Sequence, residues 1–293
     1  MSSRPFVQAA ILALICVPQC CFSQRSRAPL GENFPLEEGF TVTSDVTYTT
    51  GMKGPLQADV YVPHGTGPFA GIVFIHGGGW VSGNRNQMIS LIKALAEDGY
   101  VCFTIEYDLG QATYPHSLEE SMAAVKFFRE HAAEYHLDPA RIAVAGSSAG
   151  GELAALVALA QGDAASRVQA AMILNGVLDL TQRDDKATAA SPVTTYLGGE
   201  CKTLKEACRA ASPRYQVHAG APPFYVGHGT ADQMVSFAQA TAFVDALKQA
   251  GVPVEFYQAA DGKHTYWADP RFYQINLENM KAFLRQQFGA PSR

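Results

Sequence analysis

The stretch AVAGSSAGGELAALVALA, residues 143–160, places two adjacent serines between glycines, after an apolar run and before a strong helix former. A nucleophilic serine at a sharp strand-to-helix turn needs small neighbours two positions away on either side, because the flanking elements leave little room for a Cβ. Around Ser148 both positions are glycine, Gly146 and Gly150, whereas around Ser147 both are alanine. The stretch therefore predicts Ser148 as a nucleophile in a strand, turn and helix unit.

A second glycine-rich segment, HGGGW at residues 76–80, also follows an apolar run of strand length. Successive glycines allow the backbone to turn so that N–H groups point at a substrate oxygen, as acyl transfer requires. We expect the N–H groups of Gly78, Gly79 and Ala149 to form an oxyanion hole. His76 precedes the nucleophile in the chain and is interpreted as a structural histidine that supports the glycine turn.

The general base is expected after the serine, at the carboxyl end of a later strand. His264 follows the apolar run VEFYQA and fits this place best. His228 ends its own strand, where packing of the ring is the more natural role, and His218 lies in a segment without strand signals. We therefore predict His264 as the base.

The acid that orients the base is expected between the serine and the histidine in the chain. Asp232 lies just past the run PPFYVGHG and is preferred. Asp179 follows an earlier strand and is the next candidate, while Asp261 lies in the histidine's own loop and would have to distort it. The predicted constellation is Ser148, Asp232 and His264.

Apolar runs of strand length alternate with helical patterns along the chain. Helical periodicity covers 117–135, where Ser117 and Glu120 have the spacing of a capping box, and 235–250. Such alternation predicts a mostly parallel, eight-stranded sheet with helices on both faces and an antiparallel start, an α/β fold in one domain over 39–293. Residues 177–221 are expected to form a small lid or rim. The runs are 40–48, 56–62, 71–77, 99–107, 141–146, 168–175, 222–228 and 254–259.

The N-terminal residues have the pattern of a signal peptide: Arg4, about a dozen apolar residues, then small residues before Gln24. We expect a signal peptide over 1–23, cleavage after Ser23, an irregular leader over 24–38, and a secreted or periplasmic protein. The alternatives are an uncleaved anchor or a buried helix. The apolar run is too short for a stable membrane span.

The formal net charge is −5, and no block of Lys or Arg occurs in the 293 residues. This pattern excludes an electrostatic footprint for nucleic acid or for an anionic membrane surface. Cys102 lies in an apolar run and is interpreted as a buried small hydrophobe, and no cysteine spacing resembles a zinc site. Cys201 and Cys208 are too far apart on one straight helix to bridge, so a disulfide requires the chain to bend between them. The sequence leaves this pairing open, as it does the oligomeric state.

The motifs HGGGW, GSSAG, HGTAD and DGKHTY, in this order, resemble those of the α/β-hydrolase esterases and lipases. Within them the chain is most similar to the feruloyl and acetyl-xylan esterase-like group called BD-FAE, and to the related hormone-sensitive lipase branch. The similarity extends over about residues 40 to 288 and includes YPHSLEESMAAVKFFREHAAEYHLDPARIAVAG. The resemblance implies the same nucleophile, acid, base and oxyanion residues as the patterns above.

The expected function is ester hydrolysis through an acyl-enzyme, without metal or cofactor, on acetyl or feruloyl esters of plant polysaccharide. Trp80, Tyr114 and Trp267 could form an aromatic wall that binds the substrate. The alternatives are a generic short-chain carboxylesterase, an arylformamidase-like hydrolase, or a ligand-binding protein that uses the hydrolase scaffold without catalysis.

Overall fold

The structure is a computed structural model, which describes residues 39–110, 114–182 and 191–291. The predicted signal peptide and leader, residues 1–38, lie outside the described residues, as does part of the predicted rim segment. In the part of the chain that is described, no helix combines the length and the apolar character needed to cross a membrane.

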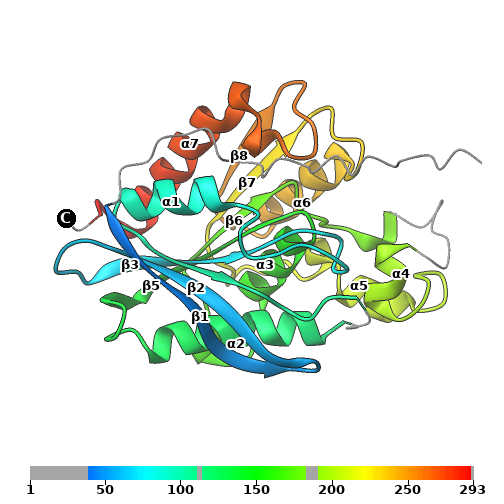
Figure 1. Ribbon diagram of the computed structural model, residues 1–293. Coiled ribbons are helices and arrows are strands. Elements are labelled where there is room, and N and C mark those ends of the chain that lie inside the picture. Colours follow the sequence, from blue (N-terminus) through cyan, green and yellow to red (C-terminus); the bar gives the residue numbers. More distant parts are fainter. Residues whose placement is uncertain (1–38, 111–113, 183–190, 292–293) are drawn as a thin grey trace, which may run out of the picture.

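One eight-stranded sheet runs through the molecule, in the order β1-β2-β4-β3-β5-β6-β7-β8 (Figure 1). β2 pairs antiparallel with both β1 and β4, and the remaining neighbours are parallel. This arrangement confirms the predicted mostly parallel sheet with an antiparallel start. The strands are β1 (Phe40–Gly51), β2 (Gly54–Pro63), β3 (Phe69–Ile75), β4 (Val101–Ile105), β5 (Leu137–Ser147), β6 (Ala170–Leu174), β7 (Phe224–Gly229) and β8 (Val254–Ala259).

Both faces of the central strands β3, β4, β6 and β7 are buried, which explains why these strands are unbroken apolar runs, whereas the edge strand β1 is mostly exposed. Along β3, Val73 and Ile75 point into one core and Ile72 and Phe74 into the other, as the period of two requires. The core on the first face includes side chains of α2, α3 and α6, and that on the second face includes side chains of α1 and α7. The helices therefore enclose the sheet from both sides (Figure 1).

Within the described residues, five long helices follow the strands in the order that the alternating pattern predicts. They are α1 (Ile89–Glu97), α2 (His116–Glu130), α3 (Ala149–Leu159), α6 (Phe237–Gln249) and α7 (Pro270–Phe288). The predicted capping box is wrong. Pro115 is the N-cap of α2, and Ser117 and Glu120 instead bind the backbone of Asp108, through its carbonyl oxygen and its N–H. These two side chains therefore form a tertiary contact instead of the local contacts at the helix end that the sequence pattern predicted.

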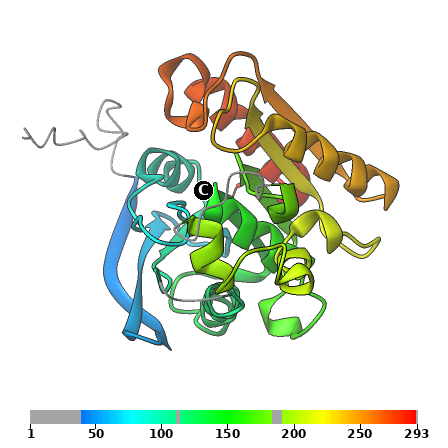
Figure 2. The same ribbon diagram turned by 90° about the vertical axis from the view of Figure 1, so that its right-hand side faces the viewer.

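The described part of the predicted rim contains two short helices, α4 (Pro192–Leu197) and α5 (Lys205–Ala210), and the 3-10 turn Pro213–Tyr215. α4 and α5 lie together at one end of the molecule in Figure 1, the end that faces the viewer in Figure 2. Cys201 and Cys208 form a disulfide with their Cα atoms 5.3 Å apart. The two cysteines do not share one straight helix, because α4 ends at Gly198, Cys201 lies in the turn that follows, and Cys208 belongs to α5.

Candidate active site

Ser148 lies at the turn between β5 and α3, with φ 57° and ψ −120°. A Cβ added to Gly146 would lie 2.0 Å from Gly150 O, and one added to Gly150 would lie 2.1 Å from Ile75 O. Only residues without a side chain fit on both sides of Ser148, which is the reason the sequence pattern pointed to this serine. Ser147 is buried and its Oγ accepts a hydrogen bond from Trp267 Nε1.

The structure brings the three predicted catalytic side chains together from the ends of three strands. His264 Nε2 lies 2.9 Å from Ser148 Oγ, and His264 Nδ1 lies 2.8 Å from Asp232 Oδ2. Ser148 follows β5, Asp232 follows β7 and His264 follows β8. In a mostly parallel sheet these carboxyl ends share one edge, so residues separated by 116 positions can meet.

The Asp232 carboxylate is almost fully supplied with donors. Oδ1 accepts from the backbone N–H groups of Met234 and Val235, and Oδ2 accepts from Asn175 Nδ2 at 2.8 Å as well as from His264. Burial alone would raise the pKa of Asp232, but hydrogen bonds from His228, His264 and Val235 outweigh it and hold this pKa well below its usual range. Asp232 therefore stays ionised.

Sequence reasoning missed Asn175. It follows β6, is fully buried and has φ 49°, a left-handed conformation that asparagine tolerates better than most residues. Its place after a buried strand at the carboxyl edge of the sheet was the one available signal.

The rival histidines have other partners. His228 is fully buried with Nε2 3.0 Å from Val235 O and 3.3 Å from Asp232 Oδ2, so it supports the acid rather than reaching Ser148. His218 accepts from Gly220 N at Nδ1, and its Nε2 lies 3.2 Å from Leu159 O. Both ring nitrogens of His218 are thus engaged.

The rival acids are also accounted for. Asp179 is fully buried and forms an ion pair with Arg214 at 3.1 Å, with Tyr215 OH and Thr181 Oγ1 as further donors. Its partners lie at both ends of the rim segment, so Asp179 ties these two ends together. Asp261 is exposed in the loop before His264, and its backbone N–H donates to Thr230 Oγ1.

The glycine turn after β3 lies directly beside the nucleophile. A Cβ on Gly77 would contact Ser147 O at 2.8 Å, and one on Gly78, at φ 126°, would overlap Ser82 O at 1.8 Å. His76 stacks on Tyr107 with ring centroids 4.5 Å apart, and burial lowers the pKa of His76 to about 4. A neutral, buried His76 supports the turn, in line with its interpretation as structural.

The expected aromatic wall is wrong for the two tryptophans. Trp80 is 1% exposed and Trp267 is 3% exposed, so neither offers a ring face to a substrate. Their indole N–H groups bind Glu152 Oε2 and Ser147 Oγ respectively, because a buried indole needs a partner for its N–H. Tyr114 is partly exposed and its ring packs edge-on against Tyr196.

Glu152 is a second residue that sequence reasoning passed over. It lies one turn after Ser148 in α3 and is fully buried, with hydrogen bonds from Trp80 Nε1 and Tyr196 OH. The available signal was a single acidic residue inside the apolar stretch GGELAALVALA.

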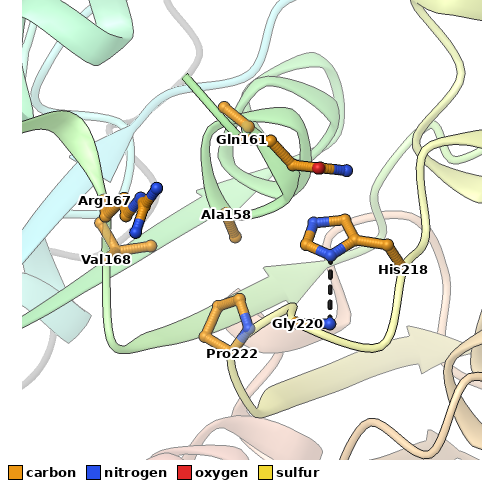
Figure 3. A pocket seen from close by; sticks show the side chains of 8 residues that line it. Ala158, Gln161, Arg167, Val168, His218, Gly220 and Pro222 are labelled. Carbon is orange, nitrogen blue, oxygen red and sulfur yellow. Dashed lines mark hydrogen bonds between the residues drawn. The ribbon is translucent and has the colours of Figure 1, made fainter. Parts of the chain in front are cut away.

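A pocket of about 330 Å³ lies away from this constellation (Figure 3). Val168 and Pro222, which precede β6 and β7, line it, so it opens at the amino edge of the sheet. Figure 3 shows His218 in its wall, bonded to Gly220. Across 39–110, 114–182 and 191–291, no group of three or more His, Cys, Asp or Glu side chains is placed to hold a metal ion.

Comparison with known proteins places the chain among named esterases. It is 33% identical over 240 residues to Esterase LipQ of Mycobacterium tuberculosis, covering 76% of this chain and 56% of LipQ. It is 36% identical over 211 residues to the probable carboxylic ester hydrolase LipM of the same organism, covering 66% of this chain and 48% of LipM. The chain spans about half the length of these relatives.

Solved structures share the fold over nearly their full length. A thermophilic esterase of Thermogutta terrifontis, Est2, superposes with a TM-score of 0.73 at 28% identity, covering 87% of this chain and 95% of Est2. A truncated carbohydrate esterase from gut microbiota superposes with a TM-score of 0.76 at 23% identity, covering 86% of this chain and 98% of that one. The fold is that of the α/β-hydrolase esterases. The BD-FAE family model matches residues 58–247, and the chain belongs to the BD-FAE family.

Proposed function

We propose that this protein is a serine carboxylic ester hydrolase in which Ser148, His264 and Asp232 act as a catalytic triad. The hydrogen-bonded chain from Ser148 Oγ through both ring nitrogens of His264 to Asp232 Oδ2 carries the proposal, with steps of 2.9 and 2.8 Å. Nucleophile, base and orienting acid need this order of contacts. The esterase names of the relatives support the same reaction.

In the proposed reaction His264 Nε2 takes the proton of Ser148 Oγ as this oxygen attacks the ester carbonyl carbon. The carbonyl π electrons move to its oxygen, and the N–H groups of Gly78, Gly79 and Ala149 hold the resulting oxyanion. The imidazolium returns the proton to the departing alcohol, which leaves an acyl-enzyme. Water, deprotonated by His264, then attacks the acyl carbon; the bond to Ser148 Oγ breaks, Oγ takes the proton back from His264, and the acid is released. Asp232 keeps Nδ1–H of His264 oriented throughout.

The proposed substrates are acetyl or feruloyl esters of plant polysaccharide, with the acetyl ester preferred. Structures of Thermogutta terrifontis Est2 are described with propionate and with butyrate bound, which supports a short acyl group. The burial of Trp80 and Trp267 removes two of the three side chains expected to hold a feruloyl ring. Export from the cytoplasm, expected from the N-terminal pattern, fits an extracellular polymer and remains part of the proposal.

The test is acid release by the purified protein from acetylated xylan, methyl ferulate and p-nitrophenyl acetate, with Ser148→Ala as the blank. We expect acetate release from xylan well above the blank, and a loss of about 10⁴–10⁶ in kcat for Ser148→Ala. Retention of more than about a tenth of the activity by Ser148→Ala would contradict the nucleophile assignment.

If only p-nitrophenyl acetate is hydrolysed, the proposed triad mechanism stands but the polysaccharide substrate is wrong. The protein would then be a generic short-chain carboxylesterase. Turnover of an aryl formamide alone would favour the arylformamidase-like alternative. A folded wild-type protein that turns over no substrate and takes up no fluorophosphonate label at Ser148 would favour the ligand-binding alternative.

A further inference from the structure

The Glu152 carboxyl group joins three elements at the candidate active site. Glu152 belongs to α3, the helix that begins directly after Ser148, and its side chain is 0% exposed. Its Oε2 accepts a hydrogen bond from Trp80 Nε1 at 3.1 Å, and its Oε1 accepts one from Tyr196 OH at 3.1 Å. Trp80 follows the last glycine of the turn after β3, and Tyr196 belongs to the rim helix α4.

The partners of Glu152 are an indole and a phenol, neither of which carries a charge. Burial raises the pKa of Glu152 well above its usual range and so favours the neutral carboxyl, while the hydrogen bonds from Trp80 and Tyr196 act in the opposite direction. A neutral carboxylic acid offers one carbonyl oxygen to the indole N–H and one O–H group that can exchange a hydrogen bond with the phenol. Glutamine offers the same set, a carbonyl oxygen and an N–H donor.

Trp80 transmits this contact to the glycine turn. Its ring stacks on Tyr196 with centroids 4.4 Å apart and planes 5° from parallel, and its carbonyl oxygen accepts from Gly110 N at 2.9 Å. On the other side of the turn, Pro192 Cβ at the start of α4 lies 3.1 Å from the place of a Cβ on Gly79. Trp80, which follows Gly79 in the chain, and α4, which begins beside Gly79, are thus both bound to Glu152.

We propose that Glu152 is a positioning residue, which locks Trp80 to α4 and so holds the N–H groups of Gly78 and Gly79 toward the oxyanion of the tetrahedral intermediate. The inference rests on the proposed ester hydrolysis. It predicts that loss of this carboxyl damages binding of the tetrahedral state more than binding of the ester, because the oxyanion exists only after attack.

The test compares Glu152→Leu, which removes both acceptors, with Glu152→Gln, which keeps the hydrogen-bonding set. Asp179→Asn is the matched control, since Asp179 is also a fully buried carboxyl that binds the rim, through Arg214, without a bond to Trp80. The measurements are kcat and KM for p-nitrophenyl acetate per titrated active site, and the inhibition constant of a short-chain trifluoromethyl ketone. Ser148 Oγ adds to the carbonyl carbon of the ketone, which produces a tetrahedral oxyanion.

Glu152→Leu is expected to lower kcat about 10²-fold, the effect of one misplaced oxyanion donor, with KM within about threefold of wild type. The ketone should bind weaker by a similar factor. Glu152→Gln should stay within about threefold of wild type in both quantities. Asp179→Asn is expected to lower the unfolding temperature while the ketone affinity relative to KM stays unchanged.

Equal losses in ester and ketone binding by Glu152→Leu, or a Glu152→Gln variant as damaged as Glu152→Leu, would overturn the inference. If Glu152→Leu does not fold, Trp80→Phe takes its place, because it removes the indole N–H and keeps a ring beside Tyr196. A Trp80→Phe variant with unchanged ketone affinity would equally overturn it. A wild-type protein that hydrolyses no ester would overturn both the proposed function and the inference. If the wild type is active, the variants test the role of Glu152 separately from the proposed function.

Discussion

His76 is a buried histidine beside the glycine turn, and its protonation makes the stability of the protein depend on pH. Burial lowers its pKa from 6.5 to about 4, so the folded protein keeps it neutral over a range in which the unfolded chain binds a proton. A lowered histidine pKa means that stability is present above pH 6.5 and is lost as the pH falls toward 4. The difference of about 2.5 pH units corresponds to about 3 kcal/mol.

The measurement is the free energy of unfolding in urea at several pH values between 7 and 4. For wild type we expect a decrease on acidification that includes about 3 kcal/mol from His76. His76→Gln keeps an N–H donor for the Gly77 carbonyl and removes the titration, so its decrease should be smaller by about that amount. Equal pH slopes for the two proteins would refute the assignment.

The two tryptophans show what residue type alone leaves undecided. Trp80 lies beside the glycine turn and Trp267 lies three positions after His264, so both stand next to catalytic motifs in the sequence. Each indole is buried against a neighbouring element with its N–H paired. An aromatic side chain close to a catalytic motif can be buried in the core beside the site or can contact the substrate. Burial of its large apolar surface is favourable in either place, so its position in the sequence does not decide between the two roles.

The turn between β5 and α3 is an element whose shape tolerates no side chain at two positions. A Cβ at Gly146 would lie 2.0 Å from Gly150 O, a backbone atom that cannot move without shifting the start of α3. Gly146→Ala is expected to cost about 3 kcal/mol or more of unfolding free energy and to abolish activity.

Gly162 provides the matched control for this substitution. A Cβ there would meet nothing within 4 Å, and its backbone is not in the left-handed region. Gly162→Ala should change the unfolding free energy by no more than about 0.5 kcal/mol in either direction. The measurement is the melting temperature of Gly146→Ala and of Gly162→Ala. Equal melting temperatures would mean that the backbone of the turn can shift to accommodate a Cβ at Gly146.

The Cys201–Cys208 disulfide and the Asp179–Arg214 ion pair each join two segments of the rim, residues 177–221, to one another. In the chain-entropy model, a disulfide that closes a loop of this length contributes about 2–3 kcal/mol. The double variant Cys201→Ser, Cys208→Ser should therefore unfold at a lower temperature, and hydrogen exchange should rise first in α4 and α5. Unchanged exchange in these helices would show that packing alone holds the rim.

For the whole molecule, the open prediction is export. The expected product in a secreting host is a chain that begins at Gln24, after cleavage at Ser23, with the disulfide formed. Intact-mass spectrometry of the protein from the medium or periplasm measures both features at once. An uncleaved chain that starts at Met1 and stays with the cell membrane would support the anchor alternative instead.

The general architecture was predictable because the central strands are buried on both faces and most of the long helices pack one apolar face, while α3 is buried on all sides. The eight apolar runs coincide with the eight strands to within a few residues at most ends, and no tertiary information is needed to see them. The three triad candidates were also predictable, since the glycines around Ser148 and the positions of Asp232 and His264 after strands are features of local sequence.

The remaining features depend on which segments meet in space. The sequence alone determined the sheet, the order of its helices and the serine at the turn, because periodicity and glycine placement act over a few residues. Tertiary structure alone decided that Ser117 and Glu120 bind Asp108 instead of capping α2, and that Cys201 and Cys208 meet. It also placed Asn175 behind Asp232. The hydrogen-bond partners of buried polar groups lie mostly on elements distant in the chain, so local sequence patterns do not identify them.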